Sequence, residues 1–383
     1  SIRRQRQMCI RDRFRRRRIC NYAHEAIMPL ERLHLNNFRL FKDNLFEFGD
    51  GANLILGKNG TGKTSILEAI NVLFSGNSFR TKETKTCINS DSSFFLVSGM
   101  GTVSGKNLTL SVENKFDQRI KSQRKLEGRV VRKEELSYMQ VILAKHLRMI
   151  EGEPEIRRDH FNELMFHVKP SSKALHSKYS KALKQRNKAL KRGLPQKEIS
   201  LWSSELSSIG LDLSMEQYSF FKEYKEEVKN YLEEVTSRGS FKFLEDTSIS
   251  FTKGWERSLK LSDSLKSSLD KDRALGYTSK GPHRMDFTFS IKKKKAAAQL
   301  SRGQLKILIL LTFLSNLNLL DGPNSRESIL LIDDLGSELD ITNLTEILKE
   351  ILRLKNQIIL TGIDGEEMHA SIKKLVNFTQ INL

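Results

Sequence analysis

The stretch "ANLILGKNGTGKTSILEAI", residues 52–70, decides the fold, because it joins an apolar run to a helix-like segment through a glycine-rich turn. The spacing from Gly57 to Gly62-Lys63-Thr64 satisfies the P-loop pattern. Residues 52–56 are predicted to form a buried strand. The apolar residues that follow at helical spacing are Ile66, Leu67, Ile70 and Leu73. A strand, a glycine-rich turn and a helix in this order predict a phosphate-binding loop.

Glycines let the backbone turn so that successive N–H groups point at a phosphate, and the helix N-terminus adds positive potential. Lys63 is expected to reach the β- and γ-phosphate oxygens of ATP, and Thr64 to hold Mg²⁺. The alternative, a glycine-rich turn capped by threonine, explains neither the lysine nor the flanking segments. The ATP-binding residues predicted in this loop are Gly57, Lys58, Asn59, Gly60, Thr61, Gly62, Lys63, Thr64 and Ser65.

The chain has 383 residues and a formal net charge of +19, which predicts salt-dependent attraction to polyanions. Residues 1–27 are rich in arginine and lack helical or strand periodicity, whereas the sequence from Met28 reads like a protein start. We interpret residues 1–27 as a non-native or disordered basic tail. A basic nucleic-acid-binding arm is the alternative.

Only Cys87 lies outside this tail, so neither a disulfide framework nor a zinc site is expected. Such cysteine usage suits the reducing cytoplasm. The longest apolar stretch, residues 307–314, is too short to span a membrane and predicts a buried core helix. We therefore expect a cytoplasmic protein without a membrane partner.

Composition changes along the chain predict an α/β fold in which a helical arm interrupts an ATPase head. Residues 28–145 read as short strands around the P-loop, and residues 146–240 as long charged helices. Strand-like segments return in residues 241–383. These are predicted to complete the head.

Two further stretches predict the second half of an ATP site. In "LSRGQLKILILL", residues 300–311, Ser301 and Gln304 precede an apolar helix and also fit a capping box. In "SILLIDDLGSELD", residues 328–340, a buried strand ends in Asp333 and Asp334. Parallel strands deliver carboxylates to their C-terminal edge, so Asp333 is expected to hold Mg²⁺ and Asp334 to polarise the attacking water.

Taken in order, these motifs resemble the ABC-type ATPase head. The resemblance implies that the helix after Ser301 points its N-terminus at the γ-phosphate on the P-loop of a second copy, so that ATP joins a dimer. It implies nucleotide contacts from Ser301, Gly303, Gln304 and Asp340. Gln140 is expected in a loop that senses Mg²⁺ and water, with a surface glutamine as the alternative, and Thr361 as a γ-phosphate sensor. The catalytic residues then predicted are Lys63, Gln140, Ser301 and Asp334.

Residues 28–383 are similar to the RecF family of bacterial DNA replication and repair proteins. The similarity lies in "LHLNNFRLF", residues 33–41, "EGEPEIRRDHFNELMFH", residues 151–167, and "GYTSKGPHRMDF", residues 276–287, besides the ATP motifs. Asn162, where the family has aspartate, and residues 143–147 depart from the pattern. The resemblance implies a weak DNA-dependent ATPase that dimerises with ATP on double-stranded DNA or at junctions of single and double strand. It also implies action with RecR and RecO to load RecA at gaps, in replication, recombinational repair and the SOS response.

A basic helix face supports DNA binding independently of the resemblance. Lys181, Lys184, Lys188 and Lys191 recur at helical spacing without acidic neighbours, and Arg186 and Arg192 lie nearby. Such a face is expected to contact phosphates. A merely solvated face is the alternative.

Several motifs remain open at this stage. His283, Arg284 and Asp286 are compatible with a hydrogen-bond network or with a DNA or interface contact, and residues 292–295 with a lysine-rich hairpin tip. A transporter energy subunit is disfavoured by the long arm. A nuclease is disfavoured because Asp364, Glu366 and Glu367 form too small an acidic group for a catalytic domain.

Overall fold

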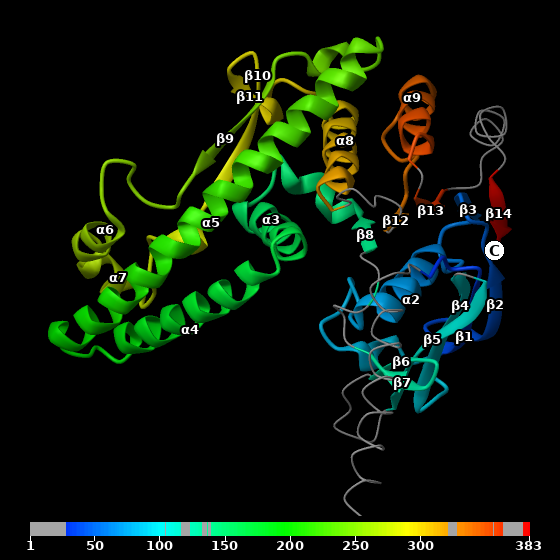
Figure 1. Cartoon of the computed structure of the whole chain (residues 1–383), viewed down its shortest axis with the longest axis horizontal. Coiled ribbons are helices and arrows are strands. Elements are labelled where there is room, and N and C mark those ends of the chain that lie inside the picture. The colour runs from blue at the N-terminus through cyan, green and yellow to red at the C-terminus, as the bar shows by residue number, and fades with distance from the viewer. Residues whose placement is uncertain are drawn as a thin grey trace, which may run out of the picture. The chain divides into compact units, whose positions relative to one another are not determined.

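The computed structural model of the chain describes residues 28–103, 105–115, 123–131, 136, 139–320, 328–354, 356–362 and 378–383 (Figure 1). The predicted basic tail, residues 1–27, therefore lies outside the described residues. The described residues form two compact units, one up to Ala144 and after Gly322, the other from Lys145 to Gly322. This division differs from the predicted one, because described residues after 240 and before 322 group with the helices and not with the P-loop.

The first unit is built mainly of strands. These are β1 (Arg32–Phe38), β2 (Phe41–Glu47), β3 (Ala52–Leu56), β4 (Phe94–Val103), β5 (Lys106–Lys115), β6 (Gln123–Leu126), β7 (Arg129–Val130), β8 (Met139–Ile142), β12 (Ile329–Ile332), β13 (Gln357–Thr361) and β14 (Thr379–Asn382). The helical elements described in it are α2 (Lys63–Ser75), α9 (Ile341–Leu352) and the 3-10 turn η1 (Thr84–Cys87).

A five-stranded parallel sheet carries the predicted site, in the order β14-β3-β13-β12-β8. Strands β12 and β13 are buried along their whole length, as expected of apolar runs in a parallel sheet covered on both faces. Ile332 pairs with Leu360, and Leu360 pairs with Leu54. The carboxyl ends of these three strands therefore meet at one edge of the sheet.

Helix α2 packs between this sheet and an antiparallel one of order β2-β1-β4-β5-β6-β7. In β4 buried and less buried residues alternate, because side chains of a strand point to opposite faces in turn. The apolar residues of α2, β1, β4 and β5 form one core with Ile329 and Leu331 of β12. The predicted P-loop helix is thus fixed on both sides by buried apolar side chains.

The second unit is mainly helical. It contains α3 (Pro154–Val168), α4 (Ser171–Lys191), α5 (Gln196–Ser237), α6 (Leu261–Ser267), α7 (Leu269–Leu275) and α8 (Arg302–Leu320), with a sheet of β9 (Thr247–Thr252), β10 (Asp286–Ile291) and β11 (Lys294–Lys295). Short 3-10 turns are η3 (Ala144–Met149, at the unit boundary), η4 (Lys242–Leu244), η5 (Pro282–Arg284) and η6 (Ala296–Ala298).

Helix α8 is apolar almost all round. By length and composition alone it satisfies the requirements of a membrane span, but 72% of its apolar window is buried inside the protein. It contacts α3 and α5, and its residues from Leu305 to Leu317 are all buried. The predicted core helix is confirmed.

A buried ion pair fastens α4 to α7. Arg186 Nη1 lies 2.8 Å from Asp272 Oδ2, and both side chains are fully buried. Arg186 also donates hydrogen bonds to Thr278 Oγ1 at 2.8 Å and to Ser203 Oγ at 2.9 Å. Segments distant in sequence are thereby held by one guanidinium.

We predict that Asp272→Ala lowers the free energy of unfolding by about 3–5 kcal/mol, because the Arg186 charge is left buried without its counter-ion. Glu233→Ala, which removes an exposed ion pair with Lys229 on α5, is the control and should cost about 0.5 kcal/mol. Urea unfolding followed by circular dichroism measures both. Equal losses of unfolding free energy in the two variants would contradict the larger contribution predicted for the buried pair.

Candidate ATP site and nucleic-acid interface

The predicted phosphate loop lies between β3 and α2, and its glycines have conformations that other residues rarely adopt. Gly60 has φ 88° and Gly62, the N-cap of α2, has φ 106°. A Cβ atom on Gly62 would lie 2.7 Å from the Phe41 ring. The turn therefore requires glycine at Gly62 both for its backbone angle and for the close approach of β2.

Lys63 folds back over its own loop. Its Nζ donates hydrogen bonds to the carbonyl oxygens of Gly57 at 2.5 Å and Lys58 at 2.9 Å. Thr61 Oγ1 donates to the Lys58 carbonyl at 3.0 Å. The ammonium group is thus positioned at the turn whose N–H groups are predicted to bind phosphate.

Two threonine hydroxyls converge on the carboxylate of Asp333. Thr64 Oγ1 donates to Asp333 Oδ1 and Oδ2 at 3.1 Å each, and Thr361 Oγ1 donates to Asp333 Oδ1 at 2.7 Å. Thr361 Oγ1 also accepts a hydrogen bond from the Asp334 N–H at 2.8 Å. Residues from β12, β13 and α2 therefore meet at one point.

This arrangement fits a magnesium nucleotide. Mg²⁺ prefers oxygen ligands and is commonly held by one or two protein oxygens together with substrate phosphates. Thr64 and Asp333 provide such oxygens beside the phosphate loop. Among the described residues no group of three or more His, Cys, Asp or Glu side chains is arranged to hold a metal by itself. The phosphates of ATP would supply the remaining ligands.

The N-terminus of α8 has the predicted capping box. The Ser301 N–H donates to Gln304 Oε1 at 3.0 Å, and the Gln304 N–H donates to Ser301 Oγ at 3.3 Å. Ser301 is exposed, whereas Gly303 and Gln304 are half-buried. The capping box accounts for the positions of the Ser301 and Gln304 side chains, and Ser301 remains exposed to solvent.

Asp340 is exposed and is the N-cap of α9. Its carboxylate accepts hydrogen bonds from the Asn343 N–H at 2.8 Å and from Asn343 Nδ2 at 2.6 Å. The hydrogen bond from the Asn343 N–H is the main reason why the pKa of Asp340 lies below its usual range. The carboxylate therefore stays charged while it caps the helix.

The expectation of a loop position for Gln140 is wrong. Gln140 lies inside β8, is only 3% exposed and pairs in register with Leu330. The apolar sequence around it completes an edge strand of the parallel sheet, and Asp333 comes three residues after Leu330. Neither the sensor position nor a surface position applies to this side chain.

Five of the six residues of the predicted basic face of α4 are exposed, whereas the prediction is wrong for Arg186. Lys181, Lys184, Lys188, Lys191 and Arg192 are exposed. Arg186 is instead fully buried and paired with Asp272, as described above, because its position on the helix faces the core of the unit. It is unavailable to DNA.

The paired-arginine and Gly-Pro-His-Arg segments form part of the internal structure. Arg157 binds both carboxylate oxygens of Asp286, at 2.7 Å and 2.9 Å, and donates to two backbone carbonyls. His283 lies between the Tyr179 hydroxyl at 2.7 Å and the Thr278 carbonyl at 3.0 Å, and burial lowers its pKa to about 4. His283 and Asp286 therefore belong to an internal hydrogen-bond network, which was one of the two alternatives for them.

Sequence reasoning missed a buried carboxylate behind the phosphate loop. Glu68 of α2 is fully buried and accepts hydrogen bonds from Arg39 Nε at 2.9 Å and Arg39 Nη2 at 2.6 Å. Arg80 approaches it at 3.6 Å, and the Ser78 hydroxyl also donates to it. A glutamate flanked by Ile66, Leu67, Ala69 and Ile70 was the available signal.

Electrostatics keep Glu68 charged in this setting. Burial raises the pKa of its carboxyl, but hydrogen bonds from Arg39 and Ser78 outweigh burial, so that the net pKa lies below the usual range. Burial and the neighbouring Glu68 charge raise the pKa of Cys87 to about 11. Cys87 is therefore an unreactive thiol at neutral pH.

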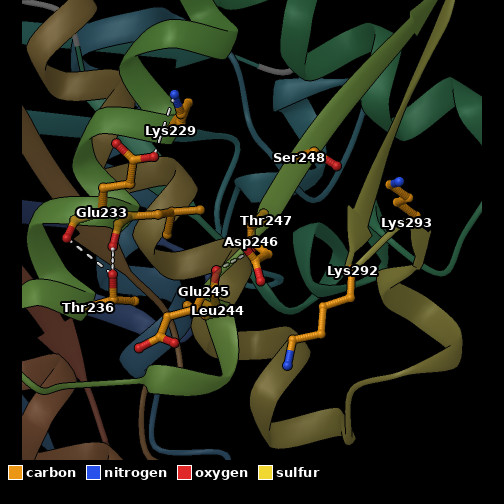
Figure 2. Close-up of a pocket in the computed structure, with 11 residues that line it drawn as sticks. Lys229, Glu233, Thr236, Leu244, Glu245, Asp246, Thr247, Ser248, Lys292 and Lys293 are labelled. Carbon is orange, nitrogen blue, oxygen red and sulfur yellow. Dashed lines mark hydrogen bonds and ion pairs between the residues drawn. The ribbon is translucent and has the colours of Figure 1, made fainter.

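The lysine-rich tip lies in the second unit, as a turn between β10 and β11. Lys292 and Lys293 there have positive φ values and line a cleft of ≈650 Å³ with the end of α5 (Figure 2). Glu233, Glu245 and Asp246 line the same cleft, so its charge is mixed. Residues Asp364, Glu366 and Glu367, on which a nuclease would depend, lie outside the described residues.

Comparison with known proteins identifies the family of the chain. The family model "RecF/RecN/SMC N terminal domain" matches residues 29–382. The DNA replication and repair protein RecF of Teredinibacter turnerae is 32% identical over 350 residues, which is 89% of this chain and 90% of that protein. The chain belongs to the RecF family. The RecF of Pseudoalteromonas translucida is 31% identical, over 91% of this chain and 95% of that one.

Solved structures share the fold. The recombination mediator protein RecF with ATPrS, in the RecFOR pathway, matches with a TM-score of 0.74 at 23% identity, over 90% of this chain and 94% of that one. An Smc head domain bound to the C-terminal domain of ScpA matches with a TM-score of 0.51 at 15% identity, over 89% and 91%. The predicted α/β ATPase-head fold and the predicted family are confirmed.

We predict that Arg39→Ala lowers the free energy of unfolding by about 3 kcal/mol, because Glu68 is left as a buried charge without its main partner. Adding Glu68→Gln should recover part of the loss. The pKa of Glu68 is lower in the folded state than in the unfolded state. The stabilisation that Glu68 gains from Arg39 is therefore complete above the unfolded-state pKa, and it is lost as the pH falls through the folded-state pKa. Urea midpoints of the wild type and of Arg39→Ala, at pH 7 and at a series of pH values below the unfolded pKa of about 4.3, measure this loss; a difference between the two proteins that is the same at every pH would contradict it.

Proposed function

We propose that the chain is an ATPase of DNA replication and repair, in which bound ATP joins two copies and so controls their hold on DNA. The observation that carries the proposal is the meeting of Thr64 and Asp333 beside the phosphate loop. Membership of the RecF family supports the general role. The ATP complex of a solved RecF supports the nucleotide.

In the proposed site each residue has a separate task. Lys63 neutralises the phosphates, the loop N–H groups from Gly57 to Ser65 cradle them, and Thr64 with Asp333 holds Mg²⁺. Asp334, which directly follows Asp333, orients and polarises the attacking water. Thr361 fixes the Asp333 carboxylate by its 2.7 Å hydrogen bond and thereby positions the metal ligand.

The proposed dimer depends on the N-terminus of α8. The partial positive charge at the start of a helix favours an anion. We infer that Ser301, Gly303 and Gln304 of one copy contact the γ-phosphate held by the other, and that Asp340 lies at the same interface. Hydrolysis removes the anion that joins the copies, so the weak ATPase activity acts as a release switch.

We predict that the wild type sediments as a dimer with ATP and Mg²⁺ and as a monomer with ADP. Lys63→Met should weaken ATP binding about tenfold to a hundredfold through loss of charge-assisted hydrogen bonds, and should thereby abolish the dimer. Ser301→Arg should abolish the dimer while ATP binding persists, and Ser301→Ala should have a smaller effect. Sedimentation velocity and nucleotide titration distinguish these cases; dimerisation of Ser301→Arg at the wild-type level would refute the interface.

DNA is proposed to bind along the exposed lysines of α4. They present positive charge without an acidic residue on the helix, so they suit a phosphate backbone and not base recognition. The substrates proposed are double-stranded DNA and junctions of single and double strand. We further propose cooperation with RecR and RecO to load RecA at gaps, within the SOS response and recombinational repair, in the cytoplasm.

We predict that changing Lys184, Lys188 and Lys191 together to alanine weakens binding to all duplex sequences alike. Each lost phosphate contact should reduce the slope of log affinity against log salt by about 0.9. The control changes three exposed lysines of α5 to alanine, Lys222, Lys225 and Lys229, which lie among acidic residues. Fluorescence anisotropy at several salt concentrations measures both; an equal loss in the control would rule out a specific role for α4.

A further inference from the structure

Tyr277 and Arg284 form an exposed aromatic and cationic pair in the second unit. The Tyr277 side chain is 40% exposed, and the Arg284 guanidinium lies 5.3 Å from the centre of its ring. Arg284 is itself exposed. A partly exposed ring that has a cation over it can stack on a base through the surface that it exposes.

The residues that follow Tyr277 are held by several hydrogen bonds. The next residue, Thr278, donates from its N–H and its hydroxyl to Asn187 Oδ1 at 2.8 Å and 2.7 Å. Ser279 donates from its N–H to the buried Asp272 at 2.9 Å, and His283 is hydrogen-bonded as described above. A ring on such a loop loses little further conformational entropy when it binds a ligand.

The same contacts place Tyr277 beside the basic face of α4. Asn187 accepts the hydrogen bonds from Thr278 and lies three residues after Lys184 and four before Lys191. Asn187 and the two lysines therefore share one side of α4. A Cβ atom on Gly276 would lie 3.4 Å from Lys191 Cγ. The Tyr277 loop therefore borders the lysines that are proposed to bind the DNA backbone.

We propose that Tyr277, backed by Arg284, stacks on an unpaired base where single-stranded DNA leaves a duplex whose phosphates are bound by α4. This inference rests on the proposed DNA binding and specifies the part of the DNA that Tyr277 contacts, the unpaired base beside the duplex. A base inside a duplex is covered by its neighbours, whereas an unpaired base offers a free face to an aromatic ring. Stacking of this kind tolerates any base. It therefore agrees with the proposed contacts of α4, which involve phosphates and do not depend on the base sequence.

The experiment compares a covalently closed circular duplex, in which every base is paired, with a linear duplex of the same sequence that bears a single-stranded tail. Tyr277→Ala should weaken binding to the tailed duplex about tenfold, as expected for the loss of one base–aromatic stack, and leave binding to the closed duplex within about twofold. Tyr277→Phe should retain wild-type binding. A 2-aminopurine at the first unpaired position should be quenched by the wild type but not by Tyr277→Ala.

A matched control is available on α5. Tyr218 is 52% exposed and has Lys222 Nζ 5.3 Å from its ring centre, so it repeats the chemistry of Tyr277 away from the α4 lysines. Tyr218→Ala should leave both affinities unchanged.

Equal weakening on both DNAs, or no weakening on either, overturns the stacking role even when the lysine variants behave as predicted. If the wild type binds no DNA, the proposed function fails and this inference fails with it.

Discussion

The carboxylate of Asp333 is the point on which the first unit depends, because it receives hydroxyl groups from two elements other than its own. Thr64 reaches it from the start of α2 and Thr361 from the end of β13. These contacts require that β3, β13 and β12 end at the same height, which their parallel register ensures. A shift of one residue in either pairing would turn the side chains to the opposite face and separate the metal ligand from the phosphate loop.

The same unit shows how a polar network can stabilise an ATP site from behind. Glu68 lies on the helix that begins at the phosphate loop, and Arg39 lies at the turn that follows β1. Their buried ion pair fixes α2 against the strands, while Phe41 of the adjacent β2 restricts Gly62 to glycine. The position of Lys63 is therefore set in part by residues outside the phosphate loop.

In the second unit the basic residues of one helix are divided between interior and surface. Arg186 is used internally, where it joins α4 to α7 and to the loop after Gly276. The lysines on the opposite side of α4 remain exposed and carry the charge proposed to bind DNA. Because the buried arginine also anchors the loop of Tyr277, the internal network determines what lies at the edge of the basic face.

The sequence by itself determined the features that depend on residues close together along the chain. The strand, turn and helix around Gly57, the capping box of Ser301 and Gln304, and the lysine side of α4 all follow from spacing and residue type. Only the tertiary structure decided the burial of Arg186, the place of Gln140 inside β8 and the pairing of Glu68 with Arg39. Helical or strand periodicity shows which side chains share a face, but the partner that covers a face comes from elsewhere: Asp272 is 86 residues from Arg186. Which charges are buried and paired is therefore fixed by packing between distant segments.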